Sequence, residues 1–272
     1  MKKRILKAFI LLLVILLVAF GCFLANAFFG NPISKALATR TAEEYLKTNY
    51  ADTDYVLKGV SFNFKDGTYF AHFNSPANID GDFTLDISML GKPLRDDYDY
   101  RVTQHGNIAL RLFFEYRERV DAVLESDTYP YTLSFGYGDL EFDREVGKPQ
   151  IEGAMTRADL VNNTQYDVCL LGAKNGELVL YVDTDEVTND KAAEILLVTK
   201  RLLDDAGISF YSVHLVLQYP PYDPEVAYQR PEGSVDLLDF LSDDIYEEGM
   251  LTRVKKCAEE TQKYYDEQDK QK

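Results

Sequence analysis

The hydrophobic pattern of the chain begins with one long uninterrupted stretch. Residues 8–29, AFILLLVILLVAFGCFLANAFF, carry no charge, and four basic residues stand directly before them, within residues 2–7. A helix of this length spans the apolar core of a bilayer. Basic residues favour the cytoplasmic side of a membrane. We therefore expect residues 1–7 to be a cytoplasmic tail, residues 8–29 a transmembrane helix in the lipid bilayer, and the remainder to be extracytoplasmic.

Two other interpretations of this stretch stay open. Ala25-Asn26-Ala27 has the small-x-small pattern of a signal-peptide cleavage site, although the apolar run is longer than the 7 to 15 residues or so of a typical signal peptide. Cys22 could end a lipoprotein box, but the bulky Phe20 stands close to it and the apolar run continues beyond it. Cleavage after Ala27 would release a soluble protein, whereas an uncleaved helix would anchor the chain.

Residues 31–127 read as a first α+β module. Gly30-Asn31-Pro32 ends the apolar helix, and an amphipathic helix is expected over residues 33–50. Asp66-Gly67 predicts a two-residue hairpin turn, which would pair Phe64 with Tyr69, Phe62 with Ala71 and Val60 with Phe73. Strict alternation predicts a third strand over residues 83–89, and a helical period follows over about residues 100–126. The helices would cover one face of a three-stranded antiparallel sheet.

Residues 128–220 read as a second module. A strand is expected at residues 131–137, and Thr156 with Asp159 resembles a capping box that opens a short helix. Asn175-Gly176 predicts a hairpin between strands at residues 166–174 and 177–183. The clearest helix covers residues 190–206 and leads to a strand at residues 208–218, which implies a right-handed crossover and a parallel strand pair. The order matches the ferredoxin-like β-α-β-β-α-β motif.

Within that hairpin the register sets Cys169 against Val182, which would place the thiol in an apolar layer as an inert side chain.

The last part of the chain changes character. Residues 221–233 are rich in proline and tyrosine and are expected to form a stiff connector that could dock a partner. Residues 234–272 read as a helical tail, with a short helix at residues 234–241 and a longer one at about residues 244–268. Cys257 would face the packed side of the longer helix.

Several segments resemble a known protein family. They are GNPISKALATRTAEEYLKTNY, FNFKDGTYFAHFNSP and FTLDISMLGK in the first module, and AAEILLVTKRLLDDAGISFY and DFLSDDIYEEGMLTRV further on. Together they are similar to the YfjL-like membrane-associated proteins of Gram-positive bacteria, an uncharacterised group. The resemblance implies topology and membrane attachment, and it supplies no activity, substrate or catalytic residue.

Charge and cysteine content narrow the function classes. The net charge is −16, and without the four basic residues before the apolar stretch the remainder stands at −20. Bulk charge therefore excludes nucleic acid as a partner. Only Cys169 and Cys257 lie beyond the apolar stretch, so a disulfide framework is not expected. The chain has no tryptophan, which disfavours a sugar-stacking site.

Candidate chemistry is sparse. His72 could face Ser61 across the first hairpin, yet no acidic residue is placed to orient the imidazole, and a surface pair is the simpler interpretation. The oxygen-rich segment from Asp183 to Asp190 lacks the glycine and spacing of a calcium loop and reads as a turn with a helix cap. The three histidines form no pair at metal-ligand spacing. We therefore assign no catalytic, cofactor-binding or metal-binding residue and expect no cofactor.

The sequence favours a single-pass membrane protein of mixed α+β class, with a non-catalytic binding or regulatory region outside the cytoplasm and a protein partner in the envelope. Two other hypotheses stay open. One is an envelope hydrolase that uses two carboxylates, because such pairs leave no local motif. The other is an accessory subunit of a membrane complex.

Overall fold

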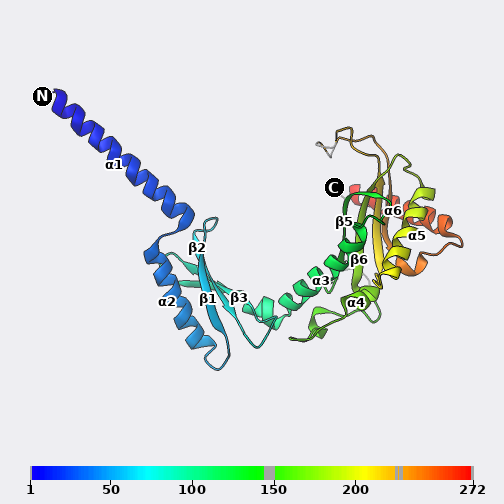
Figure 1. The fold of residues 1–272 in the computed structure, drawn as a ribbon, viewed down its shortest axis with the longest axis horizontal. Coiled ribbons are helices and arrows are strands. Elements are labelled where there is room, and N and C mark those ends of the chain that lie inside the picture. The colour runs from blue at the N-terminus through cyan, green and yellow to red at the C-terminus, as the bar shows by residue number, and fades with distance from the viewer. Residues whose placement is uncertain (1, 144–150, 224–225, 227–228, 271–272) are drawn as a thin grey trace. The chain divides into compact units, whose positions relative to one another are not determined.

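The computed structural model describes residues 2–143, 151–223, 226 and 229–270 (Figure 1). Contacts divide the chain into two compact units, Met1–Asn107 and Ile108–Lys272. Each unit carries one four-stranded sheet. The mixed α+β class expected from the sequence is thus confirmed.

Unit 1 begins with two helices that meet at a short break. Helix α1 covers Lys2–Phe29 and helix α2 covers Pro32–Asn49. Gly30 has a positive φ of 68°, and the side chain of Asn31 caps α2 by accepting a hydrogen bond from the backbone N–H of Ser34 at 2.8 Å. Pro32 occupies the first turn, where its missing N–H costs nothing. The break predicted at these residues is confirmed.

The sheet of unit 1 is antiparallel throughout, in the order β1-β2-β3-β4. Its strands are β1 (Val56–Asn63), β2 (Thr68–Asn74), β3 (Phe83–Ser88) and β4 (Pro93–Asp96). Helix α2 packs on the sheet through Ala38 and Ala42, two small side chains that let the helix lie close. Behind them, the rings of Phe73 and Phe83 stack with centroids 4.8 Å apart. The helix-covered sheet predicted for this region is confirmed, but it has a fourth strand that the sequence did not predict.

The predicted register of the first hairpin is wrong by two residues. Phe62 pairs with Tyr69 and Val60 with Ala71, because the connection has four residues rather than the two of an Asp66-Gly67 turn. The backbone N–H of Gly67 donates to the carbonyl of Asn63 at 2.9 Å, which closes this longer loop. A shift by two residues keeps every side chain on its face of the sheet, so the predicted core face survives the error.

The helix expected over residues 100–126 is shorter than predicted, and most of it belongs to unit 2. A π-helical turn at Asp99–Thr103 precedes helix α3, which covers Gly106–Leu124. We predicted that this helix would complete a module of residues 31–127. The structure instead divides the chain after Asn107, and from Ile108 onward the helix packs in the core of unit 2.

The sheet of unit 2 has the order β5-β6-β7-β8. Its strands are β5 (Thr132–Leu140), β6 (Gly176–Asp183), β7 (Ser212–Gln218) and β8 (Ser234–Leu241). Strands β6 and β7 are parallel, whereas β5 and β8 run antiparallel to their neighbours. Helix α5 (Asn189–Asp205) connects the parallel pair, as the sequence predicts.

Three predictions for this unit are wrong. Residues 168–175 form helix α4 (Val168–Asn175) and not a hairpin strand, because Asp167 caps a helical turn there. Residues 234–241 form strand β8 and not a helix, because they pair with β7. The resulting order, with β8 after β7 and β6 between β5 and β7, is not ferredoxin-like. The capping box at Thr156 is present but opens only a 3₁₀ turn, Arg157–Asp159.

The connector and the tail are part of unit 2. Residues 224, 225, 227 and 228 of the expected connector lie outside the described residues. Arg230 joins the connector to the sheet of unit 2, since its guanidinium donates to Asp183 at 2.9 Å and to the carbonyl of Tyr219 at 3.1 Å. A 3₁₀ turn at Ser242–Asp244 leads to helix α6, Met250–Asp269, which contacts β8 and α5.

Candidate functional site

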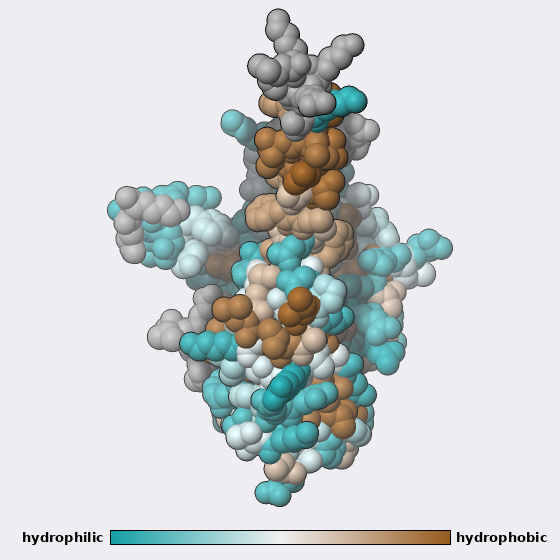
Figure 2. Space-filling view, turned by 90° about the vertical axis from the view of Figure 1, so that its left-hand side faces the viewer, coloured by the Kyte–Doolittle hydropathy of each residue, from teal (hydrophilic) through white to brown (hydrophobic). Residues whose placement is uncertain are grey.

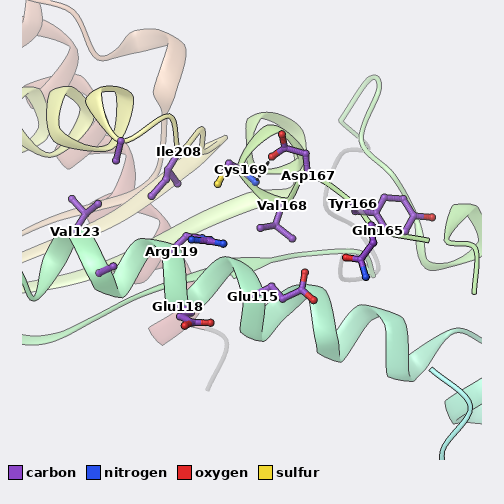
Figure 3. Close-up of a pocket in the computed structure, with 12 residues that line it drawn as sticks. Glu115, Glu118, Arg119, Val123, Gln165, Tyr166, Asp167, Val168, Cys169 and Ile208 are labelled. Carbon is purple, nitrogen blue, oxygen red and sulfur yellow. Dashed lines mark hydrogen bonds between the residues drawn. The ribbon is translucent and has the colours of Figure 1, made fainter. Parts of the chain in front are cut away.

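Unit 2 has a groove of about 580 Å³ between α3 and the segment that leads into α4 (Figure 3). Helix α3 supplies one wall with side chains spaced three or four residues apart, which share one face of a helix. The lining residues are Glu115, Glu118, Arg119, Ala122, Val123, Gln165, Tyr166, Asp167, Val168, Cys169, Ala206 and Ile208.

The second wall of the groove depends on the cap of α4. The carboxylate of Asp167 accepts hydrogen bonds from the backbone N–H of Cys169 at 3.1 Å and of Leu170 at 3.2 Å. These bonds satisfy two N–H groups that a helix start leaves unpaired. Asp167 therefore fixes both the start of α4 and the position of Cys169, which Figure 3 shows beside it.

The floor of the groove is apolar and closely packed. Val168 and Ile208 are buried. Next to them α4 approaches the chain before β7 so closely that a Cβ added at Gly172 would lie 1.9 Å from the carbonyl oxygen of Ser209. Tyr116 of α3 donates to that same carbonyl at 2.8 Å. The groove therefore has a tightly packed base beneath charged walls.

Cys169 lines the groove as a half-buried thiol and not as a strand residue in an apolar layer. Burial raises its pKa above the ordinary value and the nearby Asp167 adds to the rise, while Arg119 acts in the opposite direction. A thiol with a raised pKa stays protonated at neutral pH and is a poor nucleophile. The inert role predicted for Cys169 stays a prediction, and its predicted location in a hairpin strand is wrong, because the residue lies in α4.

The charged side chains of the groove differ in whether they form an ion pair. Glu115 accepts from Arg111 at 3.3 Å, one helical turn away. Arg119 has no carboxylate within ion-pair distance among the described residues, and it is exposed. The guanidinium therefore remains available to an acidic or carbonyl group of a ligand.

The groove also carries carboxylates, which bear on the hydrolase hypothesis. That chemistry needs one carboxyl in an apolar setting. Among the described residues of unit 2, burial raises the pKa of two carboxyls, Asp121 and Asp139, and neither lines the groove. The paired-carboxylate hypothesis stays a prediction.

Two histidine contacts complete the polar chemistry. The predicted neighbours Ser61 and His72 do meet, with Oγ and Nε2 2.9 Å apart on an exposed face of the first sheet. In unit 2, His214 of β7 lies 2.9 Å from Asp236 of β8. Sequence reasoning missed this second pair because it assigned residues 234–241 to a helix. Recognition that residues 234–241 form a strand paired with β7 would have indicated the contact between His214 and Asp236.

The oxygen-rich segment at Asp183–Asp190 is used for structure. Asp183 accepts from Gln218 at 3.0 Å and from Arg230, and the Thr188 hydroxyl caps α5 by accepting from the N–H of Lys191 at 3.2 Å. Within the described residues no group of three or more His, Cys, Asp or Glu side chains is arranged to hold a metal ion. The cysteines Cys22, Cys169 and Cys257 are free.

The fold and the groove define a mixed α+β protein with a long apolar N-terminal helix, two four-stranded sheets with helices, and a C-terminal helix. Comparison with protein families gives two matches. Residues 5–97 match the YfjL-like N-terminal domain, and residues 115–255 match the YfjL-like C-terminal domain. The second match alone covers more than half of the chain, so this protein belongs to the YfjL-like family. No curated protein and no solved structure matches it.

Proposed function

We propose that this chain is a single-pass membrane-anchored protein whose residues 31–272 lie outside the cytoplasm and bind a partner without catalysing a reaction. The observation that carries the proposal is the exposure of α1. An 18-residue window of this helix has a mean hydropathy of 2.8, and none of it is buried. Exposed apolar surface of that extent is stable in lipid and unstable in water.

The orientation follows from charge. The basic residues within positions 2–7 precede the apolar stretch, and the chain after it is acidic. The positive-inside rule then favours a cytoplasmic N-terminus. An intact anchor is favoured over cleavage after Ala27 because the apolar run of residues 8–29 is longer than the 7 to 15 residues or so of a typical signal peptide.

The groove supports a binding role. It combines an apolar floor, an available guanidinium at Arg119 and a protonated thiol at Cys169. Such a surface suits noncovalent recognition of an extended protein segment that carries a carboxylate or carbonyl group opposite Arg119.

Topology is tested on cells by reporter cysteines. Introduced into a variant that lacks the native cysteines, Glu267→Cys should react with a membrane-impermeant maleimide in intact cells stripped of their wall. Lys3→Cys should react only after the membrane is made permeable. The reverse labelling pattern overturns the orientation, and mass spectrometry of the purified chain shows whether it retains residues 1–27.

Binding at the groove is tested by site-specific photo-crosslinking. A benzoylphenylalanine at position 122 lies in the groove, and one at the exposed position 36 of α2 serves as the matched control. We expect a discrete adduct from position 122 that Arg119→Glu removes. Identical adducts from both positions, or an adduct that Arg119→Glu leaves unchanged, would contradict recognition at the groove.

A further inference from the structure

Three segments of unit 1 meet at one end of its sheet. Because Thr68 at the start of β2 pairs with Ser88 at the end of β3, the β1–β2 loop and the β3–β4 loop lie at the same end of the sheet. Helix α2 joins them, because the hydroxyl of Thr41, in the middle of the helix, donates to the carbonyl of Gly91 at 2.6 Å. The backbone N–H of Asn31 donates to the Tyr69 hydroxyl at 3.1 Å. This end of the sheet is therefore the end at which α1 leaves the unit.

The tips of these segments are apolar and exposed. We call four residues the apolar rim: Ile33, Leu37, Phe64 and Leu90. Leu90, in the β3–β4 turn, is 87% exposed, and Ile33, in the first turn of α2, is 75% exposed; exposed positions of a soluble domain usually carry polar residues. Burial of such side chains is favourable, so a rim of them calls for an apolar partner.

The apolar rim continues the surface of the apolar helix. The ring of Phe64 lies beside that of Phe28 in the last turn of α1, with centroids 6.1 Å apart. Figure 2 shows hydrophobic surface along α1 and further hydrophobic patches below it. A lipid environment around the last turn of α1 would therefore also contact the rim at Phe64.

Charge distinguishes this end of unit 1 from the other. Lys35, Lys65 and Lys92 are exposed and stand within two positions of a rim residue in the sequence, and Asp66 is the one acidic residue within that distance. The opposite end exposes three acidic residues, Asp52, Asp54 and Asp82, together with Lys47 and Lys58, so it has no excess of basic residues. In a region with a net charge of −20, a basic rim is a local reversal. Lysines beside apolar tips suit a surface of anionic lipid headgroups over acyl chains.

We propose that the apolar rim inserts into the bilayer interface next to α1 and that Lys35, Lys65 and Lys92 bind anionic lipid headgroups there. The inference rests on the membrane anchor proposed above, and it holds for either orientation of α1. The occupant of this surface is lipid, since the rim is continuous with the span and its charge complements phosphate. Unit 1 then contacts the bilayer surface through the rim as well as being linked to the membrane by α1.

The absence of tryptophan from the chain allows a direct test. Full-length single-tryptophan variants are placed in nanodiscs of equal parts phosphatidylcholine and phosphatidylglycerol, with or without brominated acyl chains that quench tryptophan. Leu90→Trp reports on the rim, Ala51→Trp on the opposite end of unit 1, and Phe20→Trp on α1. We expect quenching of Phe20→Trp and Leu90→Trp and a blue-shifted emission of Leu90→Trp. Ala51→Trp should show neither change.

The three reporters separate the two proposals. Without quenching of Phe20→Trp, the membrane anchor itself fails. With quenching of Phe20→Trp and equal emission of Leu90→Trp and Ala51→Trp, the anchor stands and the seated rim is overturned.

The lysines have their own control. Lys65→Glu combined with Lys92→Glu, or nanodiscs of phosphatidylcholine alone, should reduce the quenching of Leu90→Trp and leave that of Phe20→Trp unchanged. Quenching of Leu90→Trp that persists undiminished in both cases would overturn the binding of anionic headgroups. Circular dichroism of each variant confirms that it is folded.

Discussion

The hydroxyl of Tyr116 donates a hydrogen bond to the backbone carbonyl of Ser209, 2.8 Å away, and the Tyr116 side chain is fully buried. The two residues are 93 positions apart. This contact joins α3 to the segment before β7 beneath the groove. The site therefore depends on packing between elements that the sequence keeps far apart.

Removal of that hydroxyl tests its contribution. Tyr116→Phe keeps the ring and leaves the carbonyl of Ser209 without this donor in a buried place, so we expect a loss of about 1 to 3 kcal/mol in the free energy of unfolding. Urea unfolding of the full chain in detergent, followed by circular dichroism, measures it. Tyr222→Phe is the matched control, because Tyr222 is 75% exposed. Equal midpoints for the two variants would contradict the prediction.

Gly172 offers a steric test of the α4 contact. A Cβ there would lie 1.9 Å from the Ser209 carbonyl oxygen, a backbone atom that cannot rotate away. We expect Gly172→Ala to destabilise unit 2 by about 3 kcal/mol and to weaken crosslinking from the groove. Gly59→Ala is the control, since nothing lies within 4 Å of its added Cβ. A change of less than about 0.5 kcal/mol for Gly172→Ala would show that the segments are not packed in this way.

Asp54 gives unit 1 a pH dependence. Its carboxylate accepts from the Ser75 hydroxyl and from the N–H of Ala77, and these bonds hold its pKa below the ordinary value. The stability that this carboxylate contributes is present above its unfolded-state pKa of about 3.9 and is lost as the pH falls through the lower folded-state pKa. Asp54→Asn should therefore lower the urea midpoint at neutral pH.

The same difference should begin to narrow once the pH falls below about 4, where the unfolded chain takes up the proton, and it should vanish below the lower folded-state pKa of Asp54. Asp52→Asn, an exposed neighbour, is the control at both pH values. A difference for Asp54→Asn that is independent of pH would contradict the assignment.

Cys257 should react slowly with thiol reagents. Burial raises its pKa to about 11 from an ordinary value of 9.0, and its Sγ donates to the carbonyl of Leu238 at 3.6 Å. A rise of two units lowers the thiolate fraction about 100-fold at neutral pH. In a variant with Cys22→Ser and Cys169→Ser, we expect alkylation to accelerate by at least this factor on denaturation. Equal rates before and after denaturation would refute the burial of Cys257.

Local patterns determined much of the fold. Helix α5 was predictable because its apolar side chains recur on one face and Gly207, with φ 72°, ends it. The parallel pairing of β6 and β7 followed from the strand-helix-strand order.

Strand β8 escaped prediction for a physical reason. Its inward residues Val235, Leu237 and Phe240 are spaced by two and then by three, because the register with β7 shifts and Asp239 takes a positive φ of 52°. Such a bulge imitates part of a helical period.

Helix α4, and with it the groove, was hidden by Asn175-Gly176. Neither residue forms a hairpin turn. The Asn175 side chain donates to the carbonyls of Glu141 at 2.7 Å and Met155 at 2.8 Å. A Cβ at Gly176 would lie 2.6 Å from the carbonyl oxygen of Gly172 and 2.7 Å from the Tyr116 hydroxyl. The contacts with Glu141, Met155 and Tyr116 join residues far apart in the chain, so the Asn-Gly pattern alone could not reveal the groove.

The junction between α1 and α2 limits how far unit 1 can travel. Only Gly30 and Asn31 separate the two helices, and two residues extend over no more than about 7 Å. The side-chain amide of Asn31 also donates to the side-chain oxygen of Asn26 in α1 at 2.8 Å, and this bond restricts bending at the junction. For an anchored chain, the first sheet cannot sweep the surrounding space as a domain on a long tether would. A ligand of unit 1 has to come to the membrane surface to be met.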